Sequence, residues 1–140
     1  MNDDIAYFPE KLKSMIHYII SKCSLNANFI CLLLYFSDFN YYELYETPIS
    51  GEKYIKKTNG PISSHFLELK EELLNEGKIK ETNVKIENYK YCSLKKYDTS
   101  YLNKEEIDVI DNTINKIAHM DIKEILRAIY LGELLKIMKK

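Results

Sequence analysis

The sequence has little of several residue types on which common functional sites depend. It contains no tryptophan, one arginine and only three cysteines, Cys23, Cys31 and Cys92. An odd number of cysteines without paired spacing argues against a disulfide framework, and no CxxC-type interval or histidine pair indicates a zinc site. We therefore expect three small, buried, free thiols, and we expect no metal or other cofactor.

Neither sign of charge dominates the chain. Twenty Lys and Arg residues stand against 21 Asp and Glu residues, which leaves a formal charge of -1. Such a balance gives no broad attraction for nucleic acid or for an anionic membrane. The abundance of Lys over Arg, together with many Ile, Asn and Tyr residues, is typical of an AT-rich genome.

The sequence also lacks a long apolar run. The longest, "FICLLLYF" at residues 29–36, is much shorter than the roughly 20 residues that span a bilayer. The first residues, "MNDDIAYFPEKLKS", are acidic and then amphipathic, unlike a signal peptide. We expect a cytoplasmic protein with no membrane partner.

Apolar residues recur at helical spacing in most of what remains. Pro9 is placed for the first turn of a helix that ends near Ser24, and a second helix runs from about Asn26 to Tyr45. The first half of the second helix is apolar on every side, which is typical of a central helix, and Leu33–Phe39 is its predicted buried centre.

Further helices and one hairpin follow. A third helix is predicted from Ser63 or Ser64 to a left-handed stop at Gly77. Residues 78–94 alternate as in a β-hairpin, with its turn at Asn83 or at residues 87–88. Capping boxes at residues 103–106 and 121–124 predict a fourth and a fifth helix. The fold class is therefore mainly α (α+β), a compact domain of about five helices with one β-hairpin, in an order compatible with a winged helix.

A long segment between the second and third helices has no helical periodicity. Residues 47–64, "TPISGEKYIKKTNGPISS", contain two glycines and two prolines, and residues 59–61 form a strong turn signal. Loops of this length inside a domain are usually functional or disordered. We expect Tyr54 and Ile55 to anchor this loop on the domain.

The sequence has few candidates for catalysis. No histidine among His17, His65 and His119 has a Ser or Cys nearby in a nucleophile–base pattern, and no phosphate-binding loop is present. Asp38 is a possible site carboxylate, but we favour a charge at the edge of a core helix, bonded to a tyrosine hydroxyl or a loop amide. We expect the protein not to be an enzyme.

The order helix, helix, helix, hairpin raises the alternative of a winged-helix DNA-binding regulator. In that interpretation residues 64–75 form the recognition helix and residues 78–94 the wing. A helix in the major groove needs basic or polar side chains. This one contains three glutamates, with Glu76 directly after it, and a single lysine (Lys70), so DNA is possible as a partner but disfavoured.

Tyrosines at the end of the second helix and in the loop suggest a protein-binding surface. Tyrosine supplies large, stiff contact area and a hydroxyl group at interfaces. The same rings also serve to pack the loop onto the domain, and both roles remain open.

Several motifs of the sequence occur together in one known family. They are "LLYFSDF" at residues 33–39, Tyr45 with "PISGEKY" at residues 48–54, and "NGP" at residues 59–61. In this order they resemble the signature of the Panacea domain, the SocA-like antitoxin family, which is also described on phage-associated proteins. The C-terminal part departs from the family pattern, because it lacks the typical tryptophan and ends "AIYLGELLKIMKK".

The resemblance implies an antitoxin of a toxin–antitoxin system that neutralises a cognate protein toxin by direct binding. We expect one Panacea-like domain over residues 1–140. The expected contacts with the partner are the exposed members of the set Asp38, Tyr41, Tyr42, Tyr54, Lys57 and Asn59.

Overall fold

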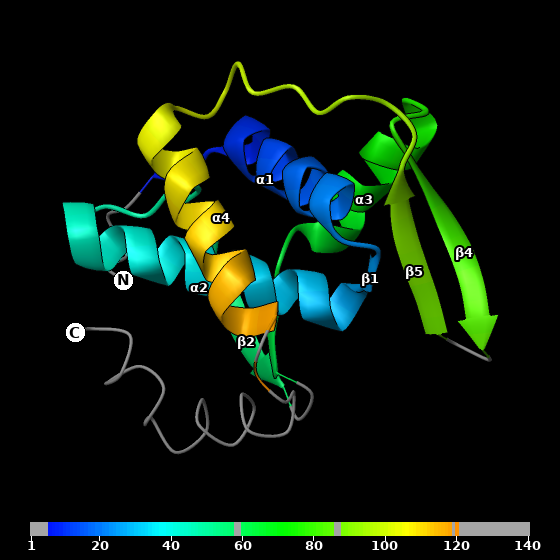
Figure 1. Ribbon diagram of the computed structural model, residues 1–140, viewed down its shortest axis with the longest axis horizontal. Coiled ribbons are helices and arrows are strands. Elements are labelled where there is room, and N and C mark those ends of the chain that lie inside the picture. Colours follow the sequence, from blue (N-terminus) through cyan, green and yellow to red (C-terminus); the bar gives the residue numbers. More distant parts are fainter. Residues whose placement is uncertain (1–5, 58–59, 86–87, 119, 121–140) are drawn as a thin grey trace.

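A computed structural model describes residues 6–57, 60–85, 88–118 and 120 of the chain (Figure 1). These residues form an α+β fold with four helices and two small antiparallel sheets. In chain order the elements are α1 (Pro9–Lys22), β1 (Leu25–Asn26), α2 (Ala27–Tyr45), β2 (Tyr54–Lys57), β3 (Gly60–Ser63), α3 (Phe66–Asn75), β4 (Ile79–Lys85), β5 (Asn88–Ser93) and α4 (Lys104–Ala118). No helix among them is long and apolar enough to cross a membrane.

Helix α2 is the central element, as the sequence predicts. The side chain of Asn26 caps its first turn by accepting a hydrogen bond from the Phe29 amide (2.9 Å). Residues Ile30–Leu34 are all buried because α1, β3 and α4 pack around the helix. The helix ends at Tyr45, where Glu46 adopts the left-handed conformation with φ of 61°.

The three-stranded sheet has the order β1-β5-β4. Strands β4 and β5 form the predicted hairpin, and their described ladder runs up to the pair Lys85↔Asn88. The alternative turn at Asn83 is wrong, because Asn83 pairs with Tyr89 inside the ladder. Strand β1 was not predicted, since two residues that pair with a strand more than 60 positions away leave no local pattern.

The segment predicted as a long loop contains a second hairpin instead. Strands β2 and β3 pair from Tyr54↔Ser63 to Lys57↔Gly60, on either side of residues 58–59. Tyr54 anchors this hairpin, as expected, but Ile55 does not, because 49% of it is exposed. Period-two alternation over four residues, with Gly60 and Pro61 in one strand, is too short a signal to distinguish a strand from a loop.

Helix α3 begins at Phe66, later than predicted. Ser63 and Ser64 do not cap it, since their hydroxyl groups donate to Glu52 and to the Lys53 carbonyl. The left-handed stop at Gly77 is confirmed by its φ of 69°.

The predicted capping box of α4 is confirmed. Asn103 Oδ1 accepts from the Glu106 amide (2.8 Å), and Glu106 Oε1 accepts from the Asn103 amide (2.9 Å). Between β5 and this helix, residues 94–103 cross over α1 (Figure 1). The predicted fifth helix and His119 lie outside the described residues.

Candidate functional site

The carboxyl group of Asp38 lies at the centre of a buried polar network. The residue is fully buried on α2. Its Oδ1 accepts a hydrogen bond from the Ser50 amide (2.9 Å), and its Oδ2 accepts from the hydroxyl groups of Ser50 and Tyr54 (2.6 Å each). Burial raises the pKa of Asp38 above its usual value, and the hydrogen bonds from Ser50 and Tyr54 oppose that rise. The interpretation of Asp38 as a structural carboxylate bonded to a tyrosine hydroxyl and a loop amide is confirmed.

A second buried carboxylate, Glu52, organises the next part of the segment. Its Oε1 accepts from the Lys53 amide and contacts His65 Nδ1, each at 2.8 Å. Its Oε2 accepts from the Ser63 hydroxyl (2.6 Å) and from the His65 amide (2.9 Å). Four partners satisfy a side chain that has no exposed surface.

Ser50 joins the carboxylate of Asp38 to the backbone of Glu52. Its hydroxyl donates to Asp38 and accepts from the Glu52 amide (3.1 Å). We call the six residues Asp38, Ser50, Glu52, Tyr54, Ser63 and His65 the carboxylate network. Buried carboxylates are stable only when such partners replace water. The network therefore holds the segment after α2, the β2–β3 hairpin and the start of α3 in one arrangement.

The segment before α1 covers the network from outside. Gly51 has a φ of 74°, and a Cβ atom there would lie 2.0 Å from the carbonyl oxygen of Ala6. The amide of Phe8 donates to the Ser50 carbonyl (2.7 Å). The ring of Tyr7 stacks on His65, with the ring centroids 4.4 Å apart. Burial, with the negative charge of Glu52, raises the pKa of Tyr7 to about 12.

The structure separates the residues predicted to contact a partner. Asp38 is buried, and Tyr41, at 8% exposure, packs against the ring of Tyr45. The hydroxyl of Tyr54 belongs to the carboxylate network. Tyr42 is half-buried and Lys57 is exposed, which leaves these two at the surface. Asn59 lies outside the described residues.

Sequence reasoning missed four members of the network, Ser50, Glu52, Ser63 and His65. Two of them stand in the "PISGEKY" motif, so the motif pointed to the correct segment. Its polar residues gave no sign of burial, because Ser and Glu are usually exposed in loops. Only the fold places them beside Asp38.

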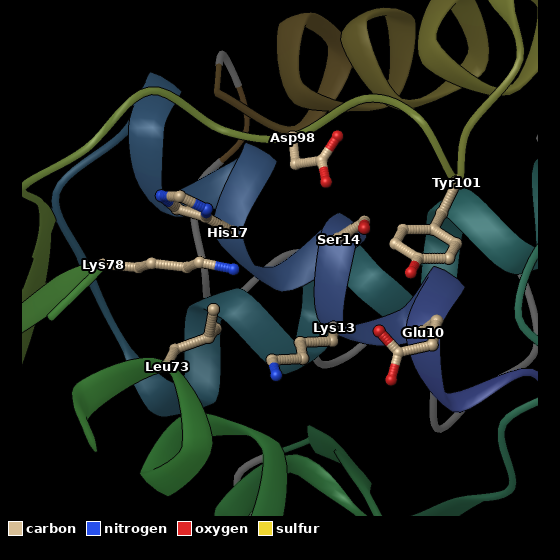
Figure 2. A pocket seen from close by; sticks show the side chains of 8 residues that line it. All are labelled: Glu10, Lys13, Ser14, His17, Leu73, Lys78, Asp98 and Tyr101. Atoms are coloured by element: carbon tan, nitrogen blue, oxygen red, sulfur yellow. The ribbon is translucent and has the colours of Figure 1, made fainter. Parts of the chain in front are cut away.

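A small polar pocket of about 40 Å³ lies elsewhere, between α1, α3 and the crossing segment (Figure 2). The side chains of Glu10, Lys13, Ser14, His17, Leu73, Lys78, Asp98 and Tyr101 line it. His17 is 3% exposed, and burial lowers its pKa although a contact with the Lys95 carbonyl opposes this. The two lysines of the pocket form salt bridges with glutamates: Lys13 with Glu72 and Glu76, and Lys78 with Glu76.

His17 does have a serine within reach, contrary to the sequence interpretation. Its Nε2 lies 3.0 Å from Ser93 Oγ and 3.1 Å from the Lys95 carbonyl oxygen. Ser93 Oγ donates its proton to that same carbonyl (2.6 Å). His17 Nε2 is therefore the donor in both contacts, and it holds the crossing segment against α1 instead of withdrawing a proton from the serine.

The cysteines and the metal-binding residue types add no further site in the described residues. All three thiols are free, but only Cys31 is buried, because Cys23 and Cys92 are partly exposed. Burial raises the pKa of the Cys31 thiol to about 11. No group of three His, Cys, Asp or Glu side chains is placed to hold a metal ion within the described ranges.

A family model described as "Antitoxin SocA-like, Panacea domain" matches residues 32–131. This range includes the whole carboxylate network, both hairpins and α4. Neither the curated proteins nor the solved structures include a match to this chain.

Proposed function

Because the chain belongs to the Panacea domain family of SocA-like antitoxins, we propose that it is the antitoxin of a toxin–antitoxin system. In this proposal it neutralises a cognate protein toxin by direct binding. The family match over residues 32–131 is the observation that supports it most strongly. Members of this antitoxin-like family are generally not enzymes, and we propose that this chain also acts by binding.

The surface next to the carboxylate network is the proposed place of contact. Tyr42 reaches the surface at the end of α2, where Leu44 and Tyr45 are 66% and 46% exposed, and Lys57 is exposed at the end of β2. Buried tyrosines at an interface centre contribute strongly to affinity. The buried ring of Tyr41 packs against the exposed ring of Tyr45.

We also propose that the chain forms a single domain. Helix α1 precedes the matched range, yet its residues Leu12, Ile16 and Ile19 lie in the same hydrophobic core as those of α2. A core shared in this way favours one folding unit.

Co-expression with the product of the adjacent gene tests the antitoxin function. The neighbouring protein alone is expected to stop growth, and this chain is expected to restore growth and to co-purify with it. A toxic neighbour that the chain neither binds nor relieves would contradict the proposal. In the same assay Tyr42→Ala is expected to weaken binding about tenfold or more, as truncation of a central interface tyrosine does.

A DNA-binding regulator is the second candidate, and one observation favours it. Without the β2–β3 hairpin, the element order is α1-β1-α2-α3-β4-β5 with the sheet order β1-β5-β4, which is compatible with a winged helix. Helix α3 would then face the DNA, but it exposes Glu68 and Glu71, which phosphates repel. A gel-shift assay on the DNA upstream of the gene, at low salt, decides the point, and absence of binding removes this candidate.

A further inference from the structure

Strand β2 is an edge strand with an unusually open surface. It pairs only with β3 in a two-stranded sheet within the described residues. Ile55, Lys56 and Lys57 are all exposed, and Ile55 exposes 49% of its surface. Open edges of this kind are templates for pairing with another strand, and proteins usually block them.

The register shows which backbone groups of β2 are unused. The Ser64 amide donates to the Lys53 carbonyl (3.2 Å), so residues 53 and 64 form a hydrogen-bonded pair. Hydrogen-bonded and non-hydrogen-bonded pairs alternate in an antiparallel ladder. The pairs Tyr54↔Ser63 and Lys56↔Pro61 are therefore non-hydrogen-bonded. The amide and carbonyl groups of Tyr54 and Lys56 point away from β3, toward the open side.

The outer edge of β3 is closed, in contrast. By the same register Pro61 faces that edge, and proline has no amide hydrogen to donate. The backbone of Ser63 lies next to the thiol of Cys31 on α2, against which β3 packs. The hairpin can accept a further strand on the β2 side only.

The side chains of β2 indicate the chemistry of such a strand. Tyr54 points inward to Asp38, so Lys53, Ile55 and Lys57 lie on the opposite face at period two. Among the described residues these two lysines and Lys56 have no carboxylate partner within salt-bridge distance. A partner strand with acidic residues on both sides of an apolar one would place opposite charges beside Lys53 and Lys57 and cover Ile55.

We propose that β2 is the docking edge for the toxin, which adds an acidic, extended segment to it as a third antiparallel or parallel strand. This inference rests on the proposed antitoxin function and names the surface that serves it. The main-chain groups of Tyr54 and Lys56 give the affinity, and Lys53, Ile55 and Lys57 select the partner. The carboxylate network makes the edge rigid before binding, because it fixes Tyr54 from inside.

The test uses the full chain and the toxic product of the adjacent gene, and it compares Lys56→Pro with Lys56→Ala. Both variants remove the same side chain, but only proline also removes the outward amide and places a ring on the edge. Neither change breaks the β2–β3 ladder, since residue 56 donates nothing to β3. We expect proline to weaken toxin binding by about tenfold or more and alanine by much less. Thermal unfolding checks that both variants fold.

Hydrogen exchange gives a second measurement that needs no variant. The amides of Tyr54 and Lys56 are expected to exchange fast in the free chain and slowly in the complex with the toxin. Charge reversal by Lys53→Glu with Lys57→Glu is expected to weaken binding, whereas the matched pair Lys80→Glu with Lys90→Glu on the β4–β5 hairpin is not.

The outcomes separate the two proposals. A complex in which residues 54 and 56 stay unprotected, or in which Lys56→Pro binds like Lys56→Ala, overturns the docking edge and leaves the antitoxin function intact. Slow exchange in the free chain also overturns it, since the edge would then be covered by the chain itself or by a second copy. If Lys80→Glu with Lys90→Glu weakens toxin binding as much as Lys53→Glu with Lys57→Glu does, the contact with the toxin does not lie on β2. A toxic neighbour that forms no complex contradicts both proposals.

Discussion

At the scale of single residues, Gly51 is a position where the backbone tolerates little change. A side chain there needs a left-handed φ and a place already occupied by the Ala6 carbonyl oxygen. We expect Gly51→Ala to lower the free energy of unfolding by more than about 2 kcal/mol, measured by urea denaturation, because strain and displacement of the backbone add.

Gly77 provides the matched control for Gly51. Its φ of 69° is similar, but a Cβ atom there would meet only the flexible end of Lys95, at 4.0 Å. We expect Gly77→Ala to lower the free energy of unfolding by about 1 kcal/mol, because only the left-handed conformation is unfavourable for alanine there. Equal losses from the two variants would show that the approach of Ala6 contributes nothing.

Asp38 should give the protein an unusual dependence of stability on pH. Burial raises its pKa in the folded chain above the ordinary 3.8 of the unfolded chain. Above pH 3.8 the unfolded chain therefore releases this proton before the folded chain does, so the free energy of unfolding falls as the pH rises through the folded pKa. The contribution is favourable at low pH and is lost toward neutral pH.

The measurement compares urea unfolding of the wild type and Asp38→Asn across this range. The wild type is expected to lose stability relative to the variant as the pH rises from 3.8. Asp98→Asn is the control of opposite sign, because the amide of Ser100 lowers the pKa of the exposed Asp98. There the relative stability of the wild type falls when the pH drops below 3.8. If the difference in free energy of unfolding between the wild type and Asp38→Asn does not change with pH, the expectation is wrong.

At the scale of elements, local sequence signals predicted the helices but not the pairing between distant segments. The apolar periodicity from about Asn26, the stop at Gly77 and the capping box at Asn103 lie within a few residues of what they control, so the sequence displays them directly. Strand β1 and the carboxylate network depend on contacts between distant segments. The burial of Asp38 was predictable in part, because it follows the apolar centre of α2, but its partners Ser50 and Glu52 were not.

Glu106 links two elements and offers a test at this scale. Its Oε1 caps α4 through the Asn103 amide, and its Oε2 accepts from Lys11 of α1 at 2.6 Å. Glu106→Ala removes both interactions and should lower the free energy of unfolding by about 2 kcal/mol. Glu106→Gln keeps a carbonyl for the cap and should cost less. Thermal unfolding of both variants and of Lys11→Met measures this, and equal losses for Ala and Gln would mean that the cap is unimportant.

At the scale of the whole molecule, α1 and the matched range share one core. Ile16 of α1 is completely buried among residues of that core. We expect Ile16→Ala to destabilise the protein by about 2–5 kcal/mol. We also expect α-helix and tyrosine circular dichroism signals to report the same shifted transition, because a single domain unfolds as a unit. Two separate transitions would contradict the single-domain proposal.

The alternation of β2 has a consequence for how such a protein can evolve. On the inner face of β2, the Tyr54 hydroxyl donates to Asp38. The Ser50 hydroxyl accepts from the Glu52 amide, and the Glu52 carboxylate contacts His65 Nδ1. A substitution at one of these positions therefore leaves a polar group of a neighbour without its hydrogen-bond partner. Lys53, Ile55 and Lys57 stand between or beside them in the chain, but their side chains face outward and make no hydrogen bond or ion pair with another described residue. Related sequences should therefore keep the first set and diversify the second. The same scaffold could then be retargeted to a new toxin by a few substitutions that leave its stability untouched.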